Sequence, residues 1–224
     1  MARVIAIDGP SGAGKSSVSR MVGKRLGFLH VDSGALYRIV TWRCLTENVD
    51  LESPEAISSE SANVEITFAS EDGRIAYRVN GEDPGDRIRT EEVSAASAKV
   101  ARVKEVRDKV TAILRKTADF GDIIVEGRDI TTAVFPDTPA RFYLTASAEA
   151  RSRRRQKQNE AIGLAGKSAE DVKAALEMRD RIDSTRKYAP LKKADGVIEI
   201  DSSDLTIDET IEAVIAALPN DWKQ

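Results

Sequence analysis

Residues 8–17 read DGPSGAGKSS and directly follow the apolar run RVIAI at residues 3–7. They match the pattern G-x-x-x-x-G-K-[ST], in which small residues let successive backbone N–H groups line a concave anion site. The helix that follows directs its positive end toward the same place. Because an apolar strand comes before the loop, a phosphate loop is favoured over a plain glycine-rich turn. The stretch therefore predicts binding of a nucleoside triphosphate.

The pattern also gives roles to single residues of this loop. Lys15 is expected to reach the β- and γ-phosphates as a catalytic cation, and the hydroxyl of Ser16 is expected to ligate Mg²⁺. The expected ATP-binding residues are Gly9, Pro10, Ser11, Gly12, Ala13, Gly14, Lys15, Ser16 and Ser17.

The composition is that of a soluble globular protein, with 224 residues, 41% of them hydrophobic and 32% charged. This length suits one α/β domain with an insertion, or two small domains. A net charge of −3 argues against a general nucleic-acid binder. Cys44 is the single cysteine, which excludes an internal disulfide, and no apolar run approaches the ~20 residues of a membrane span. Because no signal peptide stands before the first strand, we expect a cytoplasmic protein. We also expect it to be a monomer.

Five short apolar runs predict buried strands, at residues 3–7, 28–31, 122–126, 140–144 and 196–200. Continuous rather than alternating apolarity is typical of a parallel sheet covered on both faces. Helical stretches are expected between them, from the phosphate loop to Gly27, over 35–48, over roughly 91–119 and over 206–218. The predicted fold class is α/β, a five-stranded parallel sheet with helices on both faces.

One segment, at about residues 63–90, breaks this alternation. VEITF and RIAYRV alternate apolar and polar residues around the turn ASEDG, and NGEDPGD turns again before RIRT. This pattern predicts a small antiparallel hairpin or a three-stranded sheet. We expect an α/β core at 1–62 and 91–224 with this insert between, which is either ornamental or a cover for a second substrate.

A second distinctive segment is strongly basic and covers about residues 151–187. Two helical stretches are expected here, joined by AIGLAGKS at 161–168, with Ser168 as the N-cap and Asp171 three residues on. Such a charge run is ordinarily a solvated helix face. A phosphate loop elsewhere in the chain implies a polyanion nearby, which shifts the balance toward a role for some of these arginines in binding it.

The chemistry expected of the phosphate loop is narrowed by what the sequence lacks. A guanine-reading N-K-x-D is absent, and the chain is short for a motor ATPase. Arginines follow several of the predicted strands, at Arg38, Arg128 and Arg151–Arg155, where ligands bind in parallel sheets. Arg and Lys stabilise the charge of a transferring phosphoryl group, so a kinase is favoured.

No side chain has the position of a general base, because the only histidine, His30, lies inside the second predicted strand. A phosphate acceptor, with a second pKa of about 6, is largely dianionic at neutral pH and needs only positioning. The sequence therefore fits a kinase acting on a phosphate better than one acting on an alcohol.

Four segments in this order, IDGPSGAGKSS, VDSGALYR, EGRDITTAVFPD and RDRIDSTRKYAPL, resemble the bacterial cytidylate kinases over nearly the whole chain. The loop is shared by many families, whereas VDSGALYR together with GRD and VFPD is far more specific. The resemblance implies transfer of phosphate from ATP to CMP or dCMP with Mg²⁺. It also implies that the insert at 63–90 belongs to a monophosphate-binding domain and that the basic segment forms a lid.

The resemblance further implies a role for each matching residue. Cytosine would be contacted by Ser33, Arg107 and Asp129, the acceptor phosphate by Arg38, Arg128 and Arg186, and the pentose by Ser97, Arg179 and Asp183. Arg128 and the lid arginines Arg151, Arg154 and Arg155 would act in catalysis. One departure is Glu126, where many relatives carry Asp before the glycine.

Structural alternatives stand beside several of these roles. Asp129 could simply cap the helix after EGR. Asp183 could pair with Arg179 or Arg186, which on a continuous helix would share one face with it. Of the lid arginines, one or two are expected to reach phosphate and the others to be solvated. Two rival functions also remain: a kinase for a small alcohol, and a non-catalytic nucleotide-binding regulator that changes shape with ATP.

Overall fold

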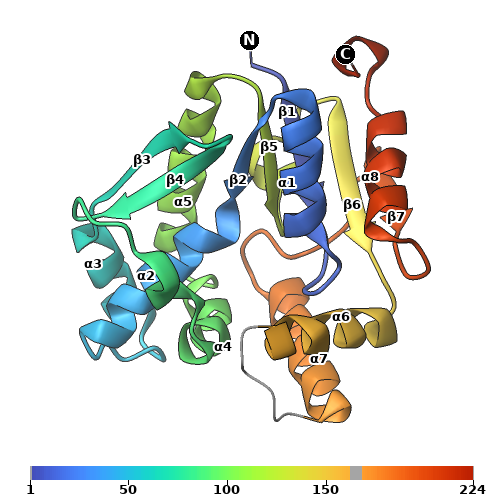
Figure 1. Cartoon of the computed structure of the whole chain (residues 1–224). Helices are drawn as coiled ribbons and strands as arrows, with labels where there is room; N and C mark the ends of the chain where they lie inside the picture. The colour runs from blue at the N-terminus through green and yellow to red at the C-terminus, as the bar shows by residue number, and fades with distance from the viewer. Residues whose placement is uncertain (1, 162–167, 224) are drawn as a thin grey trace.

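The computed structural model describes residues 2–161 and 168–223 and contains one seven-stranded sheet of order β3-β4-β2-β5-β1-β6-β7 (Figure 1). The five predicted parallel strands are confirmed, and each pairs in parallel with its neighbours. Their bounds are β1 (Val4–Asp8), β2 (Leu29–Asp32), β5 (Ile123–Gly127), β6 (Ala140–Thr145) and β7 (Ile198–Asp201). Within the described residues, no helix is long and apolar enough to cross a membrane.

The sheet is larger than expected because the insert joins it. β3 (Ile66–Glu71) and β4 (Arg74–Val79) form the predicted hairpin around a two-residue turn at Asp72 and Gly73, whose φ values are 49° and 74°. Positive φ at both residues matches the twist of the paired strands, so two residues are enough to make the turn. The turn is therefore shorter than the predicted ASEDG.

The hairpin also touches the edge of β2, where the backbone N–H of His30 donates to the carbonyl of Gly73 at 3.0 Å. This contact satisfies backbone groups that an open sheet edge would leave unpaired. The expected five-stranded sheet was therefore too small. A third strand at RIRT was also wrong, since the 3₁₀ helix η1 (Gly85–Arg89) occupies that stretch.

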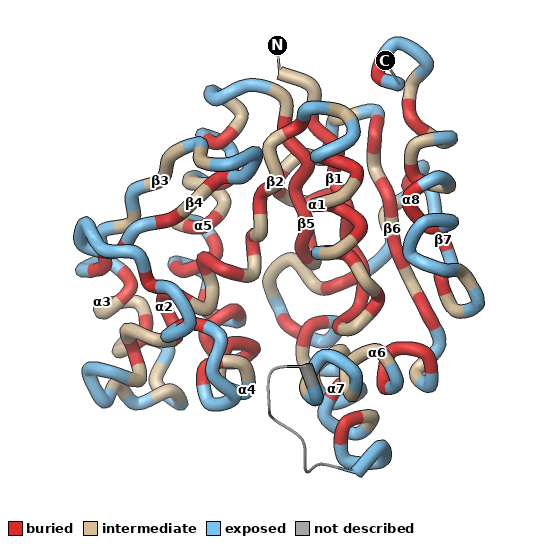
Figure 2. The backbone as a smooth tube through the Cα atoms, viewed as in Figure 1, coloured by how far each residue is buried: buried red, intermediate tan, exposed pale blue. Residues whose placement is uncertain are grey.

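Helices cover both faces of the sheet, as predicted. One face is packed by α1 (Lys15–Leu26) and α8 (Ile207–Ala216), which bury Ile5, Ile7 and Phe142. The other face is packed by α2 (Ser33–Thr46), α3 (Pro54–Asn63) and α5 (Lys104–Lys116). The central strands β1 and β5 are buried along their whole length (Figure 2). This two-sided burial explains their continuous apolarity.

The single helix expected over 91–119 is instead α4 (Glu91–Val100), α5 and the 3₁₀ helix η2 (Thr117–Phe120). The chain turns after Val100, where the N–H of Val103 donates back to the Val100 carbonyl at 3.1 Å. The break lets the two helices meet different neighbours, because α4 packs on α2 and α7 (Ala169–Thr185), whereas α5 packs on α2 and α3. One straight helix could not make both sets of contacts.

The basic segment forms α6 (Ala148–Ala161) and α7 (Ala169–Thr185), which lie beyond the carboxyl ends of the central strands (Figure 1). The predicted cap is confirmed, because Ser168 and Asp171 exchange hydrogen bonds as a capping box. Most of the expected connection between these helices lies outside the described residues. Arg186 follows α7 in extended backbone, with ψ of 147°, so it does not continue one helical face with Arg179 and Asp183.

Two short helices complete the described chain. The π-helix η3 (Ile130–Val134) follows β5, and the 3₁₀ helix η4 (Asn220–Trp222) lies after Pro219, where α8 has ended as predicted. Cys44 is buried in the core.

Candidate active site

The phosphate loop leads from β1 into α1 with the backbone that its glycines permit. Gly14 has φ of 95° at the N-cap of α1, a value that favours glycine. At Gly9, a Cβ atom would lie 2.0 Å from the carbonyl oxygen of Leu144 on β6. The loop is therefore pressed against the sheet, and the N–H groups at the start of α1 face its concave side.

Lys15 lies across this loop rather than in solvent. It is 5% exposed, and its Nζ donates to the Pro10 carbonyl at 2.8 Å. Burial lowers the pKa of Lys15 to about 7, and the nearby Arg128 acts in the same direction. An anion bound in the loop would favour the charged form of this amine.

The lid helices are joined to the loop through Asp180, a residue that the sequence analysis missed. Its carboxylate accepts from the backbone N–H of Ser11 at 2.9 Å and forms an ion pair with Arg151. Arg151 is itself buried and donates to the Ser11 carbonyl at 2.9 Å. Nothing in the sequence separated Asp180 from the other acidic residues of a charge-rich helix.

The other predicted lid arginines occupy different surroundings. Arg154 donates to Ser202 Oγ at 2.9 Å and to the Ala13 carbonyl at 3.4 Å, which places it beside the loop. Arg155 is partly buried, and its pKa is lowered by burial and by Arg38 and Arg128. Arg155 thus belongs to the same group of positive charges as Arg38 and Arg128.

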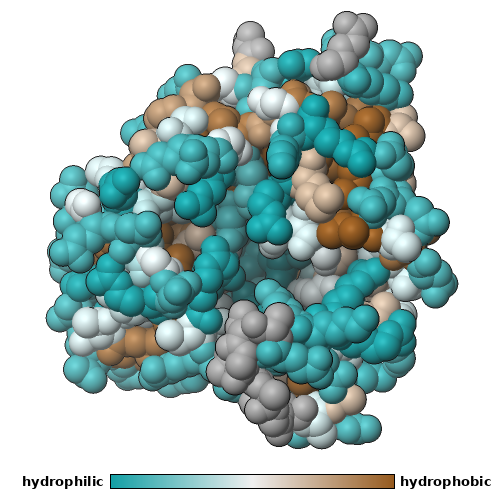
Figure 3. All heavy atoms as spheres, in the orientation of Figure 1, coloured by the Kyte–Doolittle hydropathy of each residue, from teal (hydrophilic) through white to brown (hydrophobic). Residues whose placement is uncertain are grey.

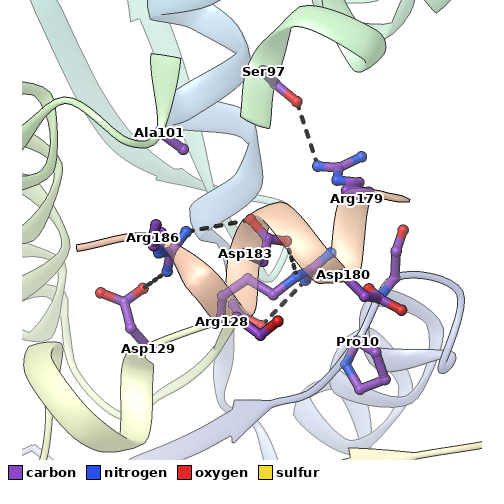
Figure 4. Close-up of polar contacts among 12 residues, drawn as sticks. Pro10, Ser97, Ala101, Arg128, Asp129, Arg179, Asp180, Asp183 and Arg186 are labelled. Atoms are coloured by element: carbon purple, nitrogen blue, oxygen red, sulfur yellow. Dashed lines mark hydrogen bonds and ion pairs between the residues drawn. The ribbon is translucent and has the colours of Figure 1, made fainter. Parts of the chain in front are cut away.

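The residues predicted to hold the acceptor phosphate come from three segments of the chain and meet carboxylates. Arg128, after β5, donates through Nε to Asp183 at 3.0 Å, and Arg186 Nη1 lies 3.4 Å from the other oxygen of Asp183 (Figure 4). Arg38, on α2, donates to Asp32 at 2.9 Å. Asp32, missed from the sequence, also caps α2 at the Ala35 N–H. Each of these cations is thus held in place by an acidic partner.

The three residues predicted to contact cytosine also lie in this region. Arg107 and Asp129 form an ion pair in which each side chain is 5% exposed, and Arg107 also donates to the Ala101 carbonyl at 3.0 Å. Ser33 is buried and donates to the Glu126 carbonyl at 2.6 Å. The alternative that Asp129 caps the next helix is wrong, because its side chain makes no capping bond to η3.

The predicted pentose residues face one another across α4 and α7. Arg179 Nη2 lies 3.4 Å from Ser97 Oγ (Figure 4), and burial lowers the pKa of Arg179 to about 10, with Arg128 adding to the effect. Asp183 does pair with Arg186, as the structural alternative held, but it binds Arg128 as well.

Glu126, the departure from the expected motif, points toward the adjacent strand. Its Oε1 lies 3.5 Å from Nε2 of His30, which is inside β2 as predicted. Neither atom has a hydrogen-bond partner among the described residues. Glu126 is paired with Ile7 of β1, so it lies close to the point where the phosphate loop begins.

Figure 3 shows a hollow near the middle of one face of the molecule, and its walls are mostly hydrophilic. A separate cavity of about 400 Å³ lies beside the phosphate loop. Its lining residues are Ala150, Arg153, Arg154, Lys157, Ser203, Asp204, Leu205 and Thr206. No group of three or more His, Cys, Asp or Glu side chains that could hold a metal occurs within residues 2–161 and 168–223.

Comparison with known proteins agrees with this geometry, since the family described as cytidylate kinase matches residues 5–220. The chain belongs to the cytidylate kinase family. Cytidylate kinase of Rhodococcus opacus is 44% identical over 209 residues, which are 93% of this chain and 91% of that protein. Cytidylate kinase of Streptomyces griseus is 42% identical over 214 residues, 95% of this chain and 90% of its own.

Membership in the cytidylate kinase family makes this chain a phosphotransferase. The fold is also shared with a protein of much lower sequence identity. An uncharacterized protein from Eubacterium ventriosum aligns with a TM-score of 0.51 at 12% identity, covering 96% of this chain and 97% of that one. This match shows a shared fold and nothing about activity.

Proposed function

We propose that this chain transfers the γ-phosphoryl group of ATP to CMP or dCMP, giving ADP and CDP or dCDP. The observation that carries the proposal is that a phosphate loop and a cluster of arginines lie together at the carboxyl ends of the parallel strands. Next to them lies a buried Arg107–Asp129 pair suited to the edge of a base. Family membership gives the expected chemistry, and this arrangement supplies a donor site and an acceptor site for it.

For the donor, we assign the triphosphate to residues 9–17 and the nucleoside to the cavity lined by Arg154 and Thr206. Ser16 would hold Mg²⁺, because its hydroxyl is exposed at the start of α1. A hydroxyl, phosphate oxygens and water form a donor set that Mg²⁺ accepts. Oε1 of Glu126, which has no hydrogen-bond partner among the described residues, adds a carboxylate near this loop. When bound, the ion would neutralise charge on the β- and γ-phosphates.

For the acceptor, we assign the phosphate to Arg38, Arg128 and Arg186. Each of these arginines pairs with a carboxylate, so each is charged and already oriented. A phosphate dianion can replace these contacts with charge-assisted, bidentate hydrogen bonds. Ser97, Arg179 and Asp183 lie where the pentose would follow.

For the base, we assign cytosine to Ser33, Arg107 and Asp129. The exocyclic amino group of cytosine is a donor, whereas uracil carries a carbonyl oxygen at the same place. A carboxylate accepts from the first group and is repelled by the second. The Asp129 carboxylate, held in place by Arg107, is therefore the feature that separates the two bases.

The reaction needs no general base on the protein, because the attacking phosphate oxygen is already ionised. Lys15 and Arg128 would stabilise the charge on the transferring group, together with lid arginines from Arg151, Arg154 and Arg155. Closure of the 63–90 insert and of the 151–187 lid over both substrates would exclude water and suppress hydrolysis of ATP. We further propose that the enzyme works as a monomer.

The test is an ADP-release assay against CMP, dCMP, UMP, AMP, GMP and shikimate. Turnover with CMP and dCMP above the other acceptors is the expected result. Turnover with shikimate alone would indicate a kinase for a small alcohol. Binding of ATP without turnover of any monophosphate would indicate a regulator, and either outcome contradicts the proposal.

A further inference from the structure

Asp8 is a fully buried carboxylate at the end of β1, directly before the phosphate loop. Its oxygens accept three hydrogen bonds from the start of η3. The backbone N–H of Ile130 donates at 2.8 Å, and Thr131 donates through its N–H at 2.8 Å and its hydroxyl at 2.6 Å. The partners are more than 120 residues apart in the chain, so the sequence analysis had no means of pairing them.

These bonds satisfy the first backbone N–H groups of η3, as an N-cap side chain does at the start of an ordinary helix. Asp129 occupies the N-cap position, but its carboxylate makes no capping bond. It contacts Arg107 and lies 3.8 Å from Arg186 instead. The distant Asp8 therefore replaces Asp129 as the cap, which leaves the Asp129 carboxylate available to a ligand.

The backbone of Asp8 is held in place by the strands on both sides of β1. Its backbone lies between Gly127 of β5 and Tyr143 of β6 in the middle of the sheet. The next residue, Gly9, begins the phosphate loop. One side chain thus connects the segment expected to bind the donor phosphates to the segment that carries Arg128 and Asp129.

We propose that Asp8 is a positioning residue for acceptor recognition. By holding the first turn of η3, it sets the direction in which Arg128 and Asp129 face the acceptor, and it does so without touching either substrate. This inference rests on the proposed function, because it concerns how strongly CMP is bound and how well it is distinguished from UMP.

The decisive variant is Asp8→Asn, which keeps the shape of the side chain but replaces one acceptor oxygen with an N–H donor. That donor would face an N–H or O–H of η3, so at least one of the three bonds is lost. We expect the KM for CMP to rise about tenfold and the CMP:UMP ratio of kcat/KM to narrow about tenfold. The KM for ATP should stay within about twofold, because the loop backbone is unchanged.

Two further substitutions separate positioning from plain loss of stability. Thr131→Val removes one donor to Asp8 and should narrow the CMP:UMP ratio less, whereas Thr131→Ser keeps the hydroxyl and should restore it. Ser53→Ala is the matched control, because it removes an N-cap bond of α3, to the N–H of Ala56, outside the predicted site. It should lower the melting temperature without changing the ratio.

A folded Asp8→Asn protein with the wild-type CMP:UMP ratio and KM for CMP would overturn the proposal. If Asp8→Asn does not fold, an unchanged ratio in Thr131→Val has the same meaning. Wild-type protein that turns over no CMP would instead refute the proposed function, so the two failures are distinguishable.

Discussion

Replacing Asp129 by Ala is the sharpest test of how this site would choose its base. If the carboxylate accepts from the amino group of cytosine, its removal should lower kcat/KM for CMP much more than for UMP. A base-edge contact discriminates by about 1–3 kcal/mol, and a narrowing of at least about tenfold in the CMP:UMP ratio corresponds to roughly 1.4 kcal/mol.

The same substitution also affects stability, and its size follows from the contacts of the site. Breaking a buried ion pair by removing one partner costs about 3–5 kcal/mol. Here Arg107 would keep its bond to the Ala101 carbonyl, and Arg186 would keep Asp183 and the Ala189 carbonyl. We therefore expect a loss near the lower figure, about 3 kcal/mol. A domain with about 5–15 kcal/mol of stability remains mostly folded after such a loss.

Two matched variants complete this experiment. Asp129→Asn keeps the shape and one acceptor oxygen, and its amide N–H can donate to uracil, so the ratio should also narrow, with less loss of stability. Arg38→Ala should lower kcat/KM for both acceptors alike, because it would hold the phosphate that they share. The assay is kcat/KM for CMP and UMP in the wild type and the three variants, beside their melting temperatures. An equal fall for both acceptors in folded Asp129→Ala would refute its assignment to the base.

Three other outcomes are expected. Lys15→Ala should leave the fold intact, since the Pro10 carbonyl is the only hydrogen-bond partner of its Nζ among the described residues, and should lower kcat by at least about 100-fold, several kcal/mol of transition-state stabilisation. Near-normal kcat would end the role of Lys15 in transfer. Burial raises the pKa of Asp8 to about 6, above its unfolded value of 3.8, so the folded state takes up the proton first as pH falls. Wild-type protein should therefore gain stability relative to Asp8→Asn as pH falls from about 7 to 5. Urea unfolding at both pH values measures the difference in free energy of unfolding between the two proteins, and a difference that stays constant would contradict the prediction. CMP with a non-hydrolysable ATP analogue should increase protection from hydrogen exchange in the 63–90 insert and in the helices of the 151–187 lid; unchanged exchange in both would count against closure.

The local parts of this protein could be predicted from the sequence because the physical cause of each lies within a few residues. The five parallel strands are continuous apolar runs, and burial on both faces of the sheet requires such runs. Gly14 and Gly27 bound α1 because both adopt a left-handed backbone. Ser168 and Asp171 are three residues apart and bond to each other at the start of α7. The sequence thus determined the phosphate loop, the order of strands and helices, and the family.

The carboxylates that organise the predicted site were decided by the tertiary structure alone. Asp8 meets η3 across more than 120 residues, and Asp180 meets Ser11 across 169. In a chain that is 32% charged, nothing local distinguishes these acids from those exposed to solvent. Likewise, the hairpin joins the main sheet because the edge of β2 is open to the turn at Gly73, and α4 and α5 separate because they pack on different neighbours. Contacts between distant segments depend on the path of the whole chain, and short sequence patterns do not contain that path.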